Sequence, residues 1–154
     1  MNGVKPLVLK DIASYINQPV KGTGTCADLL RYTQGGNPKY PPYPTWRWIK
    51  GPAPDKNTPL GTFVATFHDN NGTQFGSGDV HKHPRHVGAF YGTYSKGNHN
   101  GIVLVDQYED RTDPGEVIAQ SKYPYGGYPE YHEVYWKDYI HNGSNYFIVV
   151  VPCE

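Results

Sequence analysis

Prolines interrupt residues 35–59 so often that no long helix or strand can form there. They fall in the sequences NPKYPPYP and GPAP, and proline lacks the backbone N–H that helices and sheet ladders require. The whole chain contains 18 glycines, 14 prolines and 14 tyrosines. Glycine and proline favour turns, whereas tyrosine favours strands. This composition predicts short strands joined by loops and argues against a helical bundle.

The remaining pattern predicts a single α+β domain over residues 1–154, a length that suits one hydrophobic core. Helical patterns are confined to the N-terminal part, around residues 10–15 and from Cys26 to the glycines at positions 35 and 36. Strand patterns follow in GTFVATFH, HVGAFY, GIVLVDQY, VYW and YFIVVV. We therefore expect an N-terminal helical part packed on an antiparallel sheet of four to six strands.

Turn signals separate the predicted strands. Asn71 and Gly72 are typical of a tight hairpin, and the segment KGNHNG predicts the turn between HVGAFY and GIVLVDQY. The later segment KYPYGGYPEY is too irregular for a strand and is predicted to be a loop. Its tyrosines would line one wall of a substrate cleft or cap a sheet edge: Tyr123, Tyr125, Tyr128 and Tyr131.

Charge and hydropathy argue against nucleic-acid and membrane partners. Fourteen Lys and Arg balance fourteen Asp and Glu, so the chain lacks the basic excess that nucleic-acid backbones require. No stretch approaches the roughly 18 apolar residues of a membrane span, and the first residues have too short an apolar core for a secretory signal. Two N-x-[ST] sequons, at Asn71 and Asn142, are compatible with a secreted eukaryotic protein.

Cys26 stands where a loop of small residues, GTGT, meets the helix pattern ADLLRYT. An ordinary thiol has a pKa near 8.5, and the N–H groups at a helix start stabilise an anion by about 0.3–1 kcal/mol. That is less than one pKa unit, so a reactive cysteine here needs a histidine beside it. The alternative is a buried structural cysteine, because Cys26, Leu29 and Leu30 share the inward face of the helix.

His86 and Asp106 are the partners that the strand pattern predicts for Cys26. His86 begins a strand whose face continues with Gly88, and Asp106 ends the apolar strand face of Ile102. A carboxylate on an apolar face is costly unless it is paired, and a hairpin would bring it alongside His86. A catalytic imidazole needs such a group to fix its tautomer and orientation. The sequence therefore predicts a Cys–His–Asp constellation in papain-like order.

A second arrangement of histidines competes with this one. The spacing of His81, His83 and His86 could place imidazoles around Zn²⁺. Lys82 and Arg85 oppose a cation, however, and no nearby Cys or Glu completes the ligand set. We expect no metal and no cofactor, but a small zinc protein remains an alternative hypothesis.

Five segments resemble the family-2 type VI secretion amidase effectors, which are NlpC/P60-like cysteine peptidases. They are GTCADLLRYT, TWRWIKG, GTFVATF, RHVGAFYG and GIVLVDQY, in the order and spacing of that family. The resemblance covers residues 20–110 and extends to relatives that ticks and mites secrete as antibacterial factors. It implies a papain-like fold with Cys26 as nucleophile, His86 as general base and Asp106 as the residue that orients the histidine.

The resemblance also implies a function. The chain would hydrolyse peptide crosslinks of bacterial peptidoglycan, at the D-alanine–diaminopimelate bond, as a monomeric antibacterial toxin. It would be secreted or delivered to the periplasm of a target cell, and a bacterial member would have an immunity protein as partner. The rival hypothesis from another class is a non-catalytic wall- or glycan-binding module that uses exposed Tyr and Trp as stacking platforms. Cys153 is expected to be an unpaired terminal residue, whereas a disulfide with Cys26 would block the nucleophile.

Overall fold

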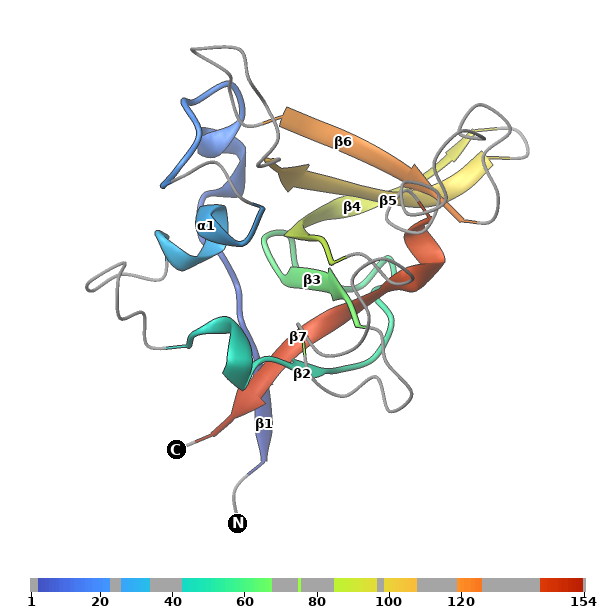
Figure 1. The fold of residues 1–154 in the computed structure, drawn as a ribbon. Helices are drawn as coiled ribbons and strands as arrows, with labels where there is room; N and C mark the ends of the chain where they lie inside the picture. The colour runs from blue at the N-terminus through green and yellow to red at the C-terminus, as the bar shows by residue number, and fades with distance from the viewer. Residues whose placement is uncertain are drawn as a thin grey trace.

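The fold is built around one antiparallel sheet (Figure 1) in a computed structural model that describes residues 3–22, 26–33, 43–67, 75, 85–96, 99–107, 119–125 and 142–153. Within these residues the sheet has seven strands: β1 (Val4–Pro6), β2 (Ile49–Lys50), β3 (Phe63–Thr66), β4 (Val87–Lys96), β5 (His99–Asp106), β6 (Ala119–Pro124) and β7 (Tyr146–Pro152). The strand order is β1-β7-β3-β4-β5-β6, and β2 pairs with β7. Every strand pair is antiparallel.

Helices in the described residues are short and lie mainly in the N-terminal part. The α-helix α1 spans Cys26–Arg31, and three 3-10 helices are η1 (Ile12–Tyr15), η2 (Thr45–Arg47) and η3 (Gly143–Asn145). The α-helix begins at Cys26, as the sequence predicts, but ends before the glycines at positions 35 and 36. None of these helices is long and apolar enough to cross a membrane.

The sheet has more strands than the four to six predicted from the sequence. β1 and β2 have three and two residues, so neither is long enough to produce a periodic pattern. β2 also lies inside the proline-rich stretch that was predicted to be loop. The hairpin at Asn71–Gly72 and the strand VYW lie outside the described residues.

β6 corrects the prediction of an irregular tyrosine-rich loop. Tyr123 lies within this strand and pairs with Ile102 of β5, and its side chain is fully buried. The strand ends at Pro124, and Tyr125 beyond it is 41% exposed. The prediction failed because the sequence AQSKYP carries no apolar alternation, so pairing with β5 and not its own hydrophobicity makes it a strand. Tyr128 and Tyr131 lie outside the described residues.

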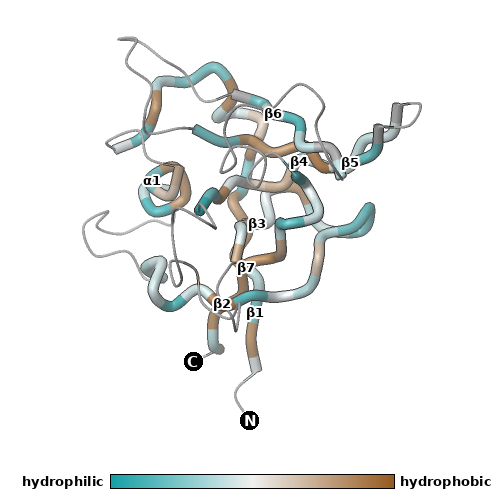
Figure 2. The backbone as a smooth tube through the Cα atoms, turned by 45° about the vertical axis from the view of Figure 1, so that its right-hand side comes forward, coloured by the Kyte–Doolittle hydropathy of each residue, from teal (hydrophilic) through white to brown (hydrophobic). Residues whose placement is uncertain are grey.

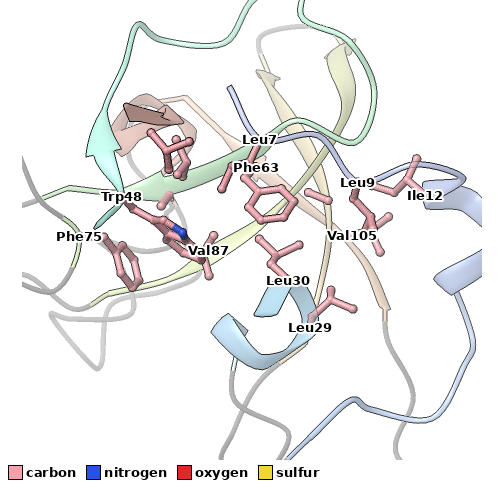
Figure 3. Packing of buried hydrophobic residues seen from close by; sticks show 14 of the residues in the cluster. Leu7, Leu9, Ile12, Leu29, Leu30, Trp48, Phe63, Phe75, Val87 and Val105 are labelled. Carbon is pink, nitrogen blue, oxygen red and sulfur yellow. The ribbon is translucent and has the colours of Figure 1, made fainter. Parts of the chain in front are cut away.

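Both faces of the sheet are covered by apolar side chains. One face carries Phe63, Ala65, Val87, Ala89 and Val105, and Leu29 and Leu30 of α1 pack against it (Figure 3). The other face carries Val64, Phe90, Ile102, Leu104, Tyr123 and Tyr146. In Figure 2 the hydrophobic stretches follow the central strands and the side of α1 that faces them. The sheet is therefore the middle layer of the core, and α1 is fixed by burial of its two leucines.

The two loop tryptophans have different environments. Trp48 is fully buried between Phe63 and Phe75, and its Nε1 donates a 2.8 Å hydrogen bond to the carbonyl of Tyr43. Trp46 is 71% exposed. Trp48 thus anchors the proline-rich segment to the core, whereas Trp46 does not.

Candidate active site

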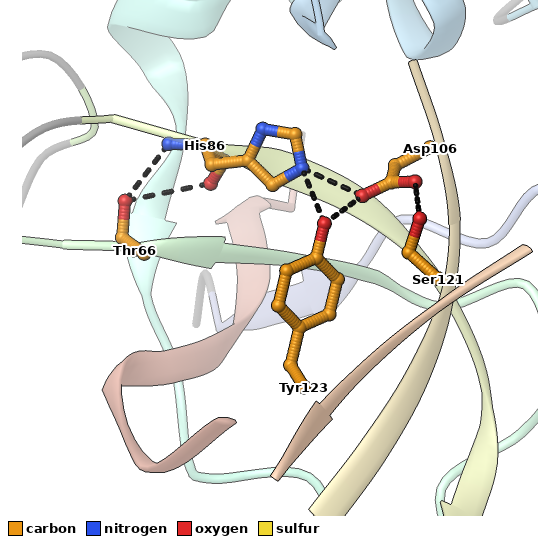
Figure 4. A network of polar contacts seen from close by, with 5 residues as sticks. All are labelled: Thr66, His86, Asp106, Ser121 and Tyr123. Carbon is orange, nitrogen blue, oxygen red and sulfur yellow. Dashed lines mark hydrogen bonds and ion pairs between the residues drawn. The ribbon is translucent and has the colours of Figure 1, made fainter. Parts of the chain in front are cut away.

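His86 and Asp106 are joined by the pairing of β4 with β5. Phe90 lies opposite Leu104 in this pair, which places Gly88 beside Asp106. A Cβ atom on Gly88 would lie 3.2 Å from the Cβ of Asp106, so the glycine leaves room for the carboxylate. His86 immediately precedes β4, and its Nε2 lies 2.7 Å from Oδ2 of Asp106 (Figure 4). The hairpin therefore produces the pairing that the sequence predicts.

Two further hydrogen bonds reach Asp106 from β6. Ser121 Oγ donates to Oδ1 at 2.7 Å, and the Tyr123 hydroxyl donates to Oδ2 (Figure 4). The same hydroxyl lies 3.4 Å from Nε2 of His86. Asp106 is completely buried and His86 is 2% exposed. A carboxylate without solvent contact is tolerated here because three donors satisfy it: the hydroxyls of Ser121 and Tyr123 on β6, and the imidazole of His86.

The backbone of His86 is held by β3. The N–H of His86 donates to Oγ1 of Thr66 at 2.9 Å, and the N–H of Thr66 donates to the carbonyl of His86 at 2.9 Å. These bonds extend the β3–β4 ladder by one position beyond the first residue of β4. The imidazole is thus carried by a backbone position with little freedom to move.

Cys26 is the first residue of α1 and is partly buried. Its side chain lies close enough to His86 to raise the pKa of the imidazole through a hydrogen bond and through charge. Because Nε2 of His86 faces Asp106, Nδ1 is the ring nitrogen left for the sulfur. Leu29 and Leu30, on the same helix face, are fully buried, which keeps the helix and its first residue against the sheet. The structure therefore brings together all three residues that the sequence singled out.

The charge state of His86 follows from these contacts. Burial by itself lowers the pKa of the imidazole, but the hydrogen bonds to Asp106 and Cys26, and the negative charges of both groups, outweigh it. The net result raises the pKa of His86 from 6.5 to about 10. At neutral pH the site therefore contains an imidazolium between a carboxylate and the sulfur of Cys26.

Gln107 ties the chain before Cys26 to the end of β5. Its side-chain Oε1 accepts a hydrogen bond from the N–H of Lys21 at 2.9 Å, and its Nε2 donates to the carbonyl of Lys21 at 2.9 Å. Gln107 is fully buried. Gly22, which follows, has a φ of 59°, and a Cβ there would collide with the carboxylate of Asp28 in α1. The approach to α1 is thus fixed to the strand that carries Asp106.

Most of the alternative metal site lies outside the described residues. Among them, no group of three His, Cys, Asp or Glu side chains is placed to hold a metal ion. His81 and His83 lie outside the described residues, and the imidazole of His86 contacts Asp106 and Cys26 instead. Cys153 and Cys26 are both free thiols, so no disulfide blocks Cys26.

Comparison with solved structures identifies a similar fold. The chain is similar to type 6 secretion amidase effector 2 (Tae2). The match has a TM-score of 0.61 with 20% sequence identity, and it covers 94% of each chain. No family model matches the sequence, and no curated protein matches it. The likeness confirms the α+β, papain-like fold that the resemblance to the type VI amidase effectors implied.

Sequence reasoning missed the contributions of β6 and of Gln107. Ser121 and Tyr123 belong to a strand with no apolar alternation, so nothing in the sequence aligned them with Asp106. The sequence does contain one indication for Gln107, because this polar residue directly follows Asp106 at the end of a long apolar strand. A polar residue there is either exposed or bonded to another segment, and here it is bonded to Lys21.

Proposed function

We propose that this chain is a peptidoglycan amidase that works as a cysteine hydrolase. The observation that carries the proposal is the contact of Cys26 with an imidazole whose far nitrogen is held by a buried carboxylate. The similarity to a protein named as an amidase effector supports the reaction class. Its substrate would be the stem-peptide crosslink of bacterial peptidoglycan, at the D-alanine–diaminopimelate bond. Secretion, or delivery to a target periplasm, would bring the protein to that substrate.

The first half-reaction uses the thiolate of Cys26 and the imidazolium of His86. The sulfur of Cys26, as thiolate, attacks the amide carbonyl, and the main-chain N–H of Cys26 donates a hydrogen bond to the oxyanion that forms. When the C–N bond breaks, the imidazolium of His86 gives the proton on Nδ1 to the leaving amine. The products are a free amine and a thioester on Cys26. His86 is therefore an acid in this step, because it already holds a proton at neutral pH.

The second half-reaction restores the thiolate of Cys26 and the imidazolium of His86. Neutral His86 now accepts a proton from water at Nδ1, and the hydroxide attacks the thioester carbonyl. The C–S bond breaks, the peptide leaves as a carboxylic acid, and the thiolate and imidazolium return. Here His86 has the general-base role that the family resemblance implied. Asp106 keeps Nε2 protonated throughout and so leaves Nδ1 as the nitrogen that exchanges the proton.

Purified diaminopimelate-type peptidoglycan tests this function. The wild type should convert crosslinked muropeptides to monomers with uptake of water, as seen by liquid chromatography and mass spectrometry. Cys26→Ala should give no product, and Cys153→Ala, the matched control at the other cysteine, should act like the wild type. Equal products from the wild type and Cys26→Ala would sink the cysteine mechanism. Cleavage at a different amide of the stem peptide would keep the amidase and overturn only the choice of bond.

A wall-binding module without catalysis makes the opposite prediction. It would bind insoluble peptidoglycan equally well with Cys26 or with alanine and would release no muropeptide. A pull-down of both proteins with peptidoglycan, run beside the product assay, separates the two functions.

A further inference from the structure

Tyr123 is a buried residue of the site to which the proposed reaction assigns no step. It lies on β6, is fully buried, and donates its hydroxyl proton to Oδ2 of Asp106. This is the same carboxylate oxygen that faces Nε2 of His86. Resting on the function proposed above, we infer that Tyr123 is a positioning residue that aims the Asp106 carboxylate at His86.

The two oxygens of Asp106 have different neighbours, and this makes the role of Tyr123 specific. Oδ2 is shared by Tyr123 and His86, so its position decides how the imidazole ring is turned. Oδ1 accepts from Ser121 at 2.7 Å and does not face the ring. Both hydroxyls help to satisfy one buried carboxylate, but only the one on Tyr123 lies within 3.4 Å of Nε2.

The ring of Tyr123 is held firmly enough to do this. Its centroid lies 5.5 Å from that of Tyr146 and 6.0 Å from that of His86. The main chain of the same residue is also closely packed, because a Cβ on Gly143 would collide with the carbonyl of Tyr123. The two neighbouring rings and this main-chain contact therefore hold the hydroxyl at Oδ2.

The electrostatic consequence reaches the imidazole. Among the described residues, the groups that face the His86 ring include Cys26 from α1, Asp106 from β5, Tyr123 from β6 and Tyr146 from β7. The hydrogen bond and the charge of Asp106 both raise the pKa of His86. A carboxylate that Tyr123 no longer aims at the ring would raise it less, so loss of the Tyr123 hydroxyl should lower the pKa of His86.

NMR titration of the His86 ring tests this without any substrate. Tyr123→Phe should move the titration midpoint of His86 downward by about one pH unit, as expected for one hydrogen bond to a charged group. Ser121→Ala, the matched control on the other oxygen, should move it by less than about a third of that. A midpoint unchanged in Tyr123→Phe, or an equal shift in Ser121→Ala, would overturn the inference.

Turnover gives a second readout that a merely structural role would not produce. Tyr123→Phe should lower kcat about tenfold and leave KM within about twofold, because it acts on the reacting groups and not on substrate binding. If the chain proves inactive on peptidoglycan, the titration midpoints of His86 still decide the role of Tyr123. If Tyr123→Phe does not fold, the wild type offers a direct test by proton NMR. A slowly exchanging Tyr123 hydroxyl proton with a nuclear Overhauser contact to the His86 ring would support the inference, and the lack of that contact would contradict it.

Discussion

His86 Nε2 lies 2.7 Å from Asp106 Oδ2, although the two residues are 20 positions apart in the chain. The β4–β5 hairpin makes this contact, and Ser121 and Tyr123 of β6 hydrogen-bond to Asp106. The positions of both side chains are therefore set by the sheet. Since both are almost completely buried, the pair acts on Cys26 as one unit.

Removing the charge of Asp106 should lower catalytic activity more than it lowers the stability of the fold. Asp106→Asn keeps the shape of the side chain but withdraws the carboxylate that raises the pKa of His86. We expect kcat on peptidoglycan to fall about 100-fold, within the range that acid–base groups contribute. Asp28→Asn is the matched control, because Asp28 is also buried but is not among the groups that raise the pKa of His86. Similar losses of kcat in both variants would contradict this role.

The His86 imidazole should titrate far above an ordinary histidine. NMR of the ring should show a midpoint near pH 10 in the wild type. In Cys26→Ala the midpoint should be lower, because both the hydrogen bond and the charge of Cys26 raise the pKa. A midpoint near the ordinary 6.5 in the wild type would show that the imidazole is not paired as described.

The same shift predicts how stability depends on pH. The pKa of His86 is higher in the folded state than in the unfolded chain, so protonation stabilises the fold. This contribution is complete below pH 6.5 and is lost as the pH rises to about 10. Urea unfolding across that window should show the free energy of unfolding of the wild type falling more steeply than that of Cys26→Ala. Parallel curves would argue against a protonated His86 in the native protein.

Gln107 should matter for both stability and catalysis. Gln107→Met removes both hydrogen bonds to Lys21 and leaves a main-chain N–H and carbonyl without these partners. We expect a loss of about 1–3 kcal/mol in the free energy of unfolding, measured by urea titration. We also expect slower alkylation of Cys26, because the segment that enters α1 is released. Gln120→Met, at an exposed position of β6, is the control and should change neither quantity.

Periodic burial explains which strands could be predicted from the sequence. β3, β4, β5 and β7 carry apolar side chains on alternate positions or in long runs, and each lies where its pattern indicates. β1 and β2 are too short to carry a pattern, and β6 is polar along its length. These three strands form because their backbones complete the hydrogen bonding of β7 and β5, which is a property of the tertiary structure.

The residues of the site also fall into those that the sequence predicts and those that it does not. Cys26, His86 and Asp106 could be predicted because each stands out locally, at a helix start or at the polar end of an apolar strand. Tyr123 and Ser121 reach Asp106 because of the register in which β6 pairs with β5. In this register Ser121 lies opposite Leu104. No local signal gives that register, so the residues that surround the carboxylate became visible only in the fold.

The burial of Asp106 also determines which residue should be replaced to obtain an inactive protein that still binds its ligand. Replacing His86 would leave a carboxylate enclosed in the core without its cation, and such proteins tend to misfold. The sulfur of Cys26 stands at the partly exposed end of the same chain of contacts, where its loss leaves no enclosed charge behind. Crystallographers who want the intact ligand in place should therefore alter the thiol and keep the imidazole.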